Sequence, residues 1–196
     1  MQTININLGH TVNKETWHTI DQVFLETVVQ AHQNSALINQ NASSASFLGT
    51  LYSSGNVINA IAAAVLSVGQ RHAPVSEARD VYESWTKEQI EEAIATKHII
   101  PGFGNSFFRD SIDPSWLPVH EYIQIFYPNI YKRINTLTEE ITEARKGKKL
   151  WPNAALYTAA LCSQLGFQHG TESMLFVMSR LPIWFTKALE TGTTEE

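Results

Sequence analysis

The spacing of apolar positions changes from a period of two to a helical period soon after the start of the chain. The stretch TININL at residues 3–8 alternates apolar and polar side chains, which predicts a short strand. Residues 32–46 are rich in Asn, Gln and Ser, and they predict a loop that leads into a helix near Ser43. Between these stretches, from Asn13 on, the apolar residues fall on one helical face: Trp17, Ile20, Val23, Phe24 and Val28.

The apolar run VINAIAAAVLSV at residues 57–68 predicts a helix without a polar face. A helix that is hydrophobic on all sides is buried on all sides, and a chain of this length has few other elements to cover it. We therefore expect a second subunit to supply part of the cover. Gly69 is expected to end this helix, and Pro74 to begin the next one.

Glycine and proline divide the second half of the chain into further helices. Thr86 and Gln89 have the spacing of a capping box, which predicts a helix over 87–96. The segment HIIPGFGNSFF at 98–108 then predicts a specified loop, because glycine permits unusual backbone angles and proline fixes one. The remaining helices are expected over 118–127, 129–145, from Pro152 to a stop at Gly166, 171–179 and 182–190. The predicted fold class is all-α with at most a minor strand.

The composition narrows the classes of function. The chain has 196 residues and a net charge of −5, with no basic run longer than RKGKK, so we do not expect it to bind nucleic acid. Only 17% of the residues are charged, which favours an oligomer. The longest apolar run is too short to span a bilayer and no signal peptide is visible, so we expect a cytoplasmic protein without a membrane segment.

Some residue types are expected to have structural roles only. Cys162 is the single cysteine, which excludes an internal disulfide, and its apolar helical context predicts a buried side chain. The scattered histidines His98, His120 and His169 lack metal-ligand spacing, so no metal site is proposed. The five tryptophans are interpreted as core or interface residues.

Five stretches resemble, in order, the motifs of one family, the citrate synthase superfamily, which includes citryl-CoA lyases. INQNAS is similar to H-E-Q-N-A-S, GQRHAPVSEA to G-P-x-H-G-G-A-N-E-A, and IPGFGNSFF to I-P-G-F-G-H-R-V-Y. LWPNAALYTAALCSQLGF resembles L-x-P-N-V-D-F-Y-S-G followed by G-F, and FVMSRLPIWFTKALE resembles F-A-x-x-R-x-x-G-W. These stretches occupy residues 38–43, 69–78, 100–108, 150–167 and 176–190.

The resemblance implies an architecture as well as a fold. Family members are helical homodimers of about twice this length, with active sites in a cleft between a large and a small domain. The chain matches their later half, so a truncated protein is implied, or one completed by a partner subunit that supplies the N-terminal half. We expect a citrate-synthase-like helical domain at 35–190, with a small subdomain at about 70–145, an N-terminal extension at 1–34 and a tail at 191–196.

The family's chemistry is a Claisen-type condensation or its reverse, and its residues are only partly present. By the resemblance, His72 is the catalytic histidine that donates to the enolate oxygen, and Arg180 binds a substrate carboxylate. Asn105 stands in place of the second catalytic histidine, and Ala155 in place of the aspartate base. The loop that lies against coenzyme A in the family corresponds to Pro101, Gly102, Phe103 and Gly104.

Further substrate-binding positions are replaced as well. Ile38 stands for a histidine, and Ser106 and Ser115 stand for arginines. Since asparagine does not transfer protons in the ordinary pH range and alanine has no chemical group, we do not expect normal synthase activity. The structural alternatives are that His72 lies at a helix junction, that Arg180 caps a helix ending at 179, and that the glycines serve only the turn.

Three hypotheses therefore stand. The favoured one is a citrate-synthase-like pseudoenzyme that binds an acyl-CoA thioester, a small polycarboxylate, or both. The second is an active enzyme of altered chemistry, such as a lyase or thioester hydrolase, with a base supplied by Asp113, Glu77 or another subunit. The third is a structural partner subunit that assembles through helices 57–68 and 154–165. The first two require that residues 72, 105, 155 and 180 converge on one cleft.

Overall fold

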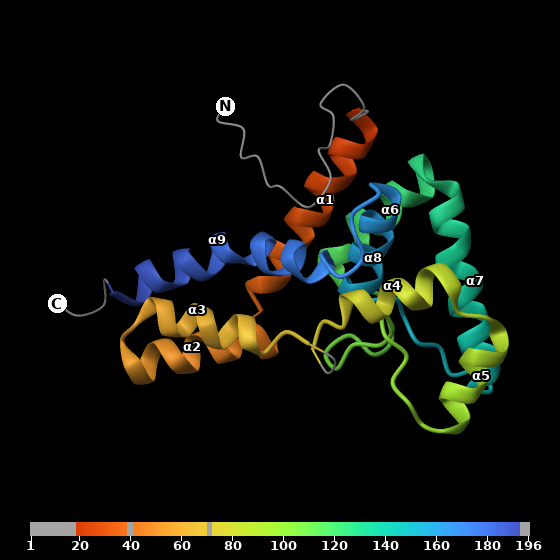
Figure 1. Cartoon of the computed structure of the whole chain (residues 1–196), viewed down its shortest axis with the longest axis horizontal. Coiled ribbons are helices and arrows are strands. Elements are labelled where there is room, and N and C mark those ends of the chain that lie inside the picture. The colour runs from red at the N-terminus through yellow and green to blue at the C-terminus, as the bar shows by residue number, and fades with distance from the viewer. Residues whose placement is uncertain (1–18, 39–40, 70–71, 193–196) are drawn as a thin grey trace.

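The computed structural model describes residues 19–38, 41–69 and 72–192 (Figure 1). These ranges are helical and contain no strand, which confirms the predicted all-α class. The strand predicted at 3–8, Trp17 and residues 193–196 lie outside the described residues. The elements in chain order are α1 (Thr19–Ala36), α2 (Ala42–Ser54), α3 (Val57–Leu66), α4 (Val75–Ser84), α5 (Lys87–Ala95), η2 (Pro114–Trp116), α6 (Leu117–Phe126), α7 (Pro128–Ala144), α8 (Ala154–Gln164) and α9 (Glu172–Gly192).

The helices form a body and an arm, as Figure 1 shows. The body consists of α4 to α8 together with α1, and it contains the largest buried hydrophobic cluster. The arm consists of α2, α3 and the C-terminal part of α9, which share a smaller cluster around Phe47 and Trp184. A third cluster, which includes Ala155 and Phe176, joins α4, α8 and α9. The domain boundaries at residues 34, 70 and 145 stay predictions; α1 spans the first of them.

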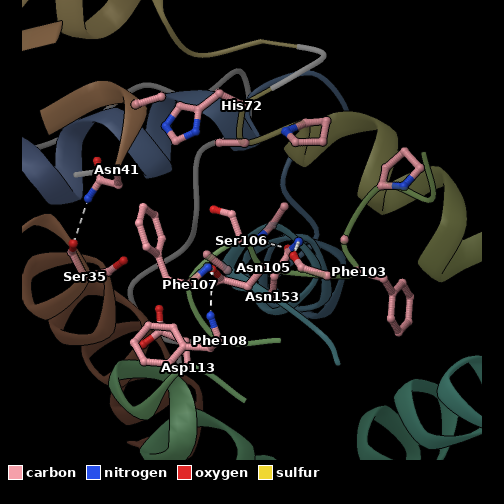
Figure 2. A pocket seen from close by; sticks show the side chains of 18 of the residues that line it. Ser35, Asn41, His72, Phe103, Asn105, Ser106, Phe107, Phe108, Asp113 and Asn153 are labelled. Atoms are coloured by element: carbon pink, nitrogen blue, oxygen red, sulfur yellow. Dashed lines mark hydrogen bonds between the residues drawn. The ribbon is translucent and has the colours of Figure 1, made fainter. Parts of the chain in front are cut away.

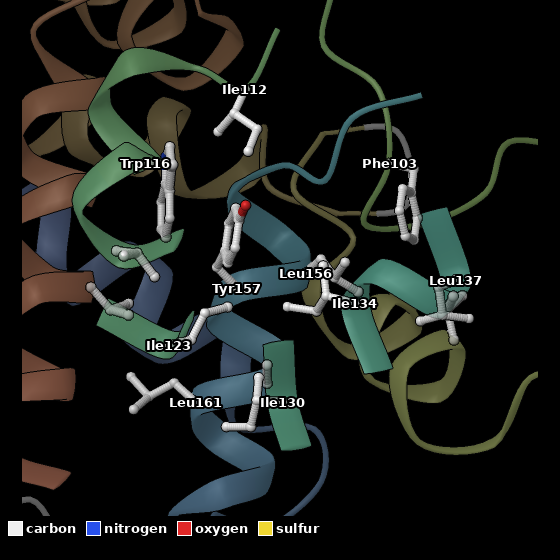
Figure 3. Packing of buried hydrophobic residues seen from close by; sticks show 14 of the residues in the cluster. Phe103, Ile112, Trp116, Ile123, Ile130, Ile134, Leu137, Leu156, Tyr157 and Leu161 are labelled. Atoms are coloured by element: carbon white, nitrogen blue, oxygen red, sulfur yellow. The ribbon is translucent and has the colours of Figure 1, made fainter. Parts of the chain in front are cut away.

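Helix α8 is the central element of the body. Its residues from Ala155 to Cys162 are all buried, and Figure 3 shows Leu156, Tyr157 and Leu161 surrounded by apolar side chains of α6, α7 and the segment before them. The small residues on α8 let α4 pack closely against it. Because α8 is enclosed within this chain, the hypothesis that helix 154–165 is an assembly surface is wrong.

Several predicted helix boundaries are confirmed. In the capping box at α5, the Gln89 side chain accepts a hydrogen bond from the Thr86 N–H at 2.9 Å. Pro128 separates α6 from α7, and α8 ends before Gly166, whose φ is +67°. Cys162 is buried as predicted.

The loop predicted over 32–46 is confirmed in part: a helix begins near Ser43 as expected, but residues 32–36 are helical. Helix α1 continues to Ala36 and α2 begins at Ala42, so only a short connection remains. Two of the polar side chains in this segment have buried partners: His32 contacts Thr158 at 2.8 Å, and the Ser44 hydroxyl donates to the Ala36 carbonyl at 3.0 Å. Polar composition therefore reflects tertiary hydrogen bonds here rather than a surface loop.

The break predicted between helices 171–179 and 182–190 is also wrong. Helix α9 runs without interruption from Glu172 to Gly192 with Pro182 inside it. Proline removes one backbone hydrogen bond from a helix, but Phe176, Arg180 and Trp184 are buried on both sides of it. The packing of these side chains keeps the two halves in one helix.

Helix α3 is less buried than its sequence predicts. Only Ala60 and Ala64 are buried, whereas Ile58 and Leu66 are 71% and 83% exposed. Among the elements that the structure describes, the helix packs mainly against α2 and α9. The expectation of burial on all sides is therefore wrong for the single chain, and cover by a second subunit stays a prediction.

A buried ion pair fastens α9 to α4 and gives the first testable prediction. Glu172 has no exposed side-chain surface; it lies 2.7 Å from the Arg79 guanidinium, and it accepts hydrogen bonds from the Ser76 hydroxyl and the Gly170 N–H. We expect Glu172→Gln to lower the free energy of unfolding by about 3 kcal/mol, because it leaves the Arg79 charge without its buried partner.

Urea-induced unfolding measures this effect. Glu83→Gln is the matched control, because Glu83 pairs with the same guanidinium at 2.7 Å but its side chain is 37% exposed, and its loss is expected to cost less than about 1 kcal/mol. Equal losses in the two variants would contradict the assignment of Glu172 as the structural partner.

Candidate functional site

A cleft of about 520 Å³ lies where the body meets the arm (Figure 2). It is bounded by the α1–α2 junction, the 72–74 segment, the 98–108 loop, the start of α8 and the middle of α9. All four predicted chemical positions line it: His72, Asn105, Ala155 and Arg180. These four residues therefore converge on one cleft, as the pseudoenzyme hypothesis and the altered-enzyme hypothesis both require.

Two backbone connections and one side chain hold the 101–104 loop against the start of α8. The Gly104 N–H donates to the Trp151 carbonyl at 2.8 Å, and the Asn153 N–H donates to the Gly102 carbonyl at 2.9 Å. The Asn153 side chain donates through Nδ2 to the Gly104 carbonyl and accepts through Oδ1 from the Ala155 N–H, each at 2.9 Å. Asn153 therefore caps α8 and fixes the cleft loop at the same time.

The four predicted coenzyme-binding residues line the cleft in different ways. Phe103 is 6% exposed, and its ring points away from the cleft into the core, toward Leu137 (Figure 3). Gly102 has φ +88°, and a Cβ there would lie 3.0 Å from two atoms of Leu156. The alternative that the turn itself requires a glycine is therefore supported at Gly102 by both φ and close packing, and at Gly104 by its φ of +82° alone.

Asn105 is engaged by its own loop. Its side-chain oxygen accepts from the Phe107 N–H at 2.8 Å and from the Phe108 N–H at 3.4 Å, which closes a local turn. The amide NH₂ is then the part of the side chain that can donate to a ligand, and no proton can be transferred by it.

Arg180 is a buried cation with neutral partners. It is 3% exposed, it donates to the hydroxyls of Ser43 and Ser35 at 3.1 and 3.3 Å, and its guanidinium lies 4.1 Å from the centroid of the Phe176 ring. Burial lowers the pKa of Arg180 to about 10, and the Asp113 charge opposes this, so the group stays protonated at neutral pH. Because Arg180 lies inside α9, the alternative that it caps a helix ending at 179 is wrong.

The position of Arg180 favours an anionic ligand. Among the residues that the structure describes, no carboxylate forms an ion pair with it, and its Nε atom is buried without a hydrogen-bond partner. A buried charge is stabilised by a counter-ion, which a carboxylate group of a ligand can supply.

His72 is neutral at physiological pH. Burial, and then the nearby Arg180 charge, lower the pKa of its imidazole to about 4. Its backbone forms two hydrogen bonds with Gly69, and its ring meets Phe176 edge to face at 6.0 Å. Within the described part of the chain, Nε2 is buried without a partner. A neutral imidazole in this place can donate one hydrogen bond to a ligand oxygen, which is the chemistry of an oxyanion donor.

The structure separates the two alternative bases. Asp113 is 6% exposed and lines the cleft, with Oδ1 accepting from the Ser115 N–H at 2.9 Å. Glu77 does not line the cleft. Ala155, which the resemblance predicts at the family's base position, is 2% exposed and adds a methyl group to the wall.

His32 is a site-adjacent residue that the sequence did not reveal. Its Nε2 lies 2.8 Å from the Thr158 hydroxyl, which in turn donates to the Ala154 carbonyl, so Nε2 carries the imidazole proton. The ring packs edge-on against Phe176 at 4.9 Å, and burial together with the Arg180 charge lowers its pKa well below 6.5. The signal was hidden because His32 lies in a polar segment that predicts a loop.

The comparisons with known proteins agree with this geometry. The family described as "Citrate synthase, C-terminal domain" matches residues 12–195, so the chain belongs to the citrate synthase family. No curated protein sequence matches the chain.

Solved structures share the fold at low sequence identity. The chain is 24% identical to citryl-CoA lyase from Hydrogenobacter thermophilus, with a TM-score of 0.75 over 92% of this chain and 72% of that one. For citrate synthase from Thermotoga maritima the identity is 20% and the TM-score 0.74, over 93% and 52% of the two chains. For ATP citrate lyase from Methanosaeta concilii in complex with (3S)-citryl-CoA they are 17% and 0.73, over 90% and 32%. The chain thus spans about half of the citrate synthase and a third of the ATP citrate lyase.

In residues 19–38, 41–69 and 72–192, no group of three or more His, Cys, Asp or Glu side chains could hold a metal ion. None of the helices described has the length and apolar character needed to cross a bilayer. Trp116 and Trp184 are fully buried, as expected of core residues.

The glycine pair in the cleft loop gives a second prediction. Gly102→Ala should lower the free energy of unfolding by about 2–4 kcal/mol, because the added methyl group strains a positive φ and overlaps Leu156. Gly104→Ala is the matched control: φ is +82°, but the methyl group would lie 3.5 Å from Leu150, so only the strain of about 1–2 kcal/mol is expected. Urea unfolding of both variants measures the difference, and an equal loss would refute close packing at Gly102.

The neutral state of His72 gives a third prediction. Nuclear magnetic resonance of the ring carbons should show His72 titrating near pH 4, against about 6.5 in the unfolded chain. Because the folded pKa is the lower one, the stabilisation by neutral His72 is complete above pH 6.5 and is lost as the pH falls toward 4. Between pH 7 and 5 this loss should be about 1–2 kcal/mol, and it should be absent in His72→Gln. A titration of His72 above pH 6 would contradict its burial beside Arg180.

Proposed function

We propose that this protein is a citrate-synthase-like binding protein that takes up an acyl-CoA, a small carboxylic acid, or both, and does not form citrate. The resemblance implies a polycarboxylate as the acid. The observation that carries the proposal is the pairing, in one cleft, of a buried Arg180 that forms no ion pair with a described carboxylate and a neutral His72, with an alanine at the predicted position of the catalytic base.

The arrangement of the cleft supports binding more than catalysis. Arg180 and His72 supply a cation and a neutral hydrogen-bond donor, which suits a carboxylate and a carbonyl oxygen. Removal of a positioned general base costs roughly 10²–10⁴ in rate, and Ala155 has no replacement group of its own. The side-chain oxygen of Asn105 already accepts a hydrogen bond from the Phe107 N–H within its own loop.

A coenzyme A thioester is the proposed second ligand. The support is the family membership of the chain, together with the solved structure of a related fold in complex with (3S)-citryl-CoA. The backbone of 101–104 would hold it, because the side chain of Phe103 is directed into the core. No metal is required by this proposal.

A second candidate function is an active enzyme of altered chemistry, such as a lyase or a thioester hydrolase. The specific observation that favours it is Asp113, a carboxylate on the cleft wall with one oxygen held by the Ser115 N–H. Its other oxygen would act as the base toward a ligand oriented by His72. Turnover of citryl-CoA or acyl-CoA that is lost in Asp113→Asn would establish this function in place of the first.

We also propose that the protein works in an assembly, as a homodimer or with a partner subunit that completes the fold. The support is a set of exposed large apolar side chains on the arm and α9: Tyr52, Ile58, Leu66, Met174, Met178, Phe185 and Leu189. This arrangement is also what the third hypothesis, a structural partner subunit, requires at α3. A cytoplasmic location is proposed from the sequence alone.

The binding proposal is tested by thermal melting of the purified chain with coenzyme A, acetyl-CoA, oxaloacetate and citrate. A ligand at 100 times its Kd stabilises the folded state by about 2.7 kcal/mol, which should raise Tm by about 5–10 °C for a chain of this size. The Arg180→Gln variant should lose the shift given by carboxylates. Met178→Gln, on the exposed face of the same helix, should keep it.

The same purified chain is used to test for citrate synthase activity. Acetyl-CoA and oxaloacetate should yield no citrate above the uncatalysed level. Citrate formation that disappears in His72→Ala would refute the absence of synthase activity, and the lack of any ligand-dependent shift would refute binding.

A further inference from the structure

The charge of the cleft restricts the acid that it can hold. Among the described residues that line it, Arg180 is the one cation and Asp113 the one carboxylate, while burial keeps His72 neutral. The two full charges cancel. A ligand with a single carboxylate can pair with Arg180, whereas a further ligand carboxylate that approached the Asp113 wall would be repelled by its like charge.

Apolar side chains line part of the cleft beside a polar end. Ser35 and Asn41 surround Arg180 at the α1–α2 junction, and both lie on the left side of Figure 2. Phe107 stands between this polar end and the Asn105 loop and is 51% exposed. The rest of the wall combines apolar and polar residues: Phe108, Ile99, Ala154 and Ala155, and His72, Asn105, Ser106, Asp113 and Asn153.

Exposed aromatic and aliphatic side chains within a cleft suit an alkyl chain. Ile99, at 69% exposure, and Phe107 leave apolar surface in water that a ligand would cover. The volume of about 520 Å³ is far larger than a two-carbon acid needs and falls in the range of sites for drug-sized ligands. The methyl group of Ala155 extends this apolar wall at the position where a carboxylate would interrupt it.

We propose that the acid bound by this cleft is a monocarboxylate with an alkyl body of four or more carbons, its carboxylate on Arg180 and its chain along Phe107 and Ala155. This inference rests on the proposed function, and it names the class of the carboxylic acid, replacing the polycarboxylate that the resemblance implies.

The test is isothermal titration of the full chain at pH 7.5 with butanoate, hexanoate, octanoate, octanamide and citrate, and separately with coenzyme A. Each added CH₂ should lower Kd about threefold to fourfold. Octanoate should bind at least tenfold more tightly than citrate, and at least tenfold more tightly than octanamide, which has the same chain without the charge.

Variants assign the two ends of the ligand. Arg180→Gln should remove the preference for octanoate over octanamide. Ala155→Asp, which places a carboxylate in the apolar wall near the start of α8, should weaken octanoate at least tenfold. Met178→Gln, an equally polar change on exposed apolar surface of α9, should leave octanoate binding unchanged, and a loss there would point to adsorption outside the cleft.

The outcomes separate this inference from the proposed function. Tighter binding of citrate than of octanoate, or equal binding of octanoate and octanamide, overturns the monocarboxylate and leaves the proposed function standing. Binding of coenzyme A together with no binding of any of the acids also overturns the monocarboxylate and leaves the proposed function standing. Absence of binding by all probes overturns both. Should Arg180→Gln fail to fold, the comparison of octanoate with octanamide in the unchanged protein still decides.

Discussion

The cleft depends on the side chain of Asn153. Its oxygen caps the N-terminus of α8, and its nitrogen holds the carbonyl of Gly104, so one planar group joins the central helix of the body to the cleft loop. Two backbone hydrogen bonds, from the Gly104 N–H to Trp151 and from the Asn153 N–H to Gly102, add to this connection, while Asn105 closes only the local turn. Since residues 155–162 of α8 are buried, these contacts fix residues 101–104 to an enclosed helix of the body.

Arg180 then determines the electrostatics of the cleft. A guanidinium that is buried among hydroxyl groups and a phenylalanine ring disfavours other positive charges nearby. His32 and His72 both pack edge-on against the same Phe176 ring, and in both burial acts together with the Arg180 charge to keep the imidazole neutral. Burial, reinforced by one buried cation, thus makes two histidines into neutral hydrogen-bonding groups. The result is a site in which Arg180 is a charged donor and His72 a neutral one.

Local signals in the sequence predicted local features well. The capping box at Thr86, the division of α6 from α7 at Pro128 and the loop at 98–108 each depend on residues close in the chain, and each is present. The convergence of four distant positions on one cleft could be predicted only through the resemblance to a family. Two failures, the loop expected at 32–36 and the helix break expected near Pro182, have one physical cause. In both, buried tertiary contacts outweigh a local preference, and those contacts involve α8 and the side chains around Arg180, which no short window of sequence contains.

The glycines of the cleft loop show why a matching motif is weaker evidence for activity than for fold. Gly102 lies so close to Leu156 and Ala78 that the packing of α4 against α8 alone demands a residue without a side chain. A sequence that keeps this fold must keep that glycine, whatever chemistry occurs beside it. At Ala155 the demand is different, because the position faces the cleft wall and a small group fills it without loss of packing. The requirement of the fold at Gly102 and the predicted requirement of the reaction at residue 155 are therefore separable in this cleft.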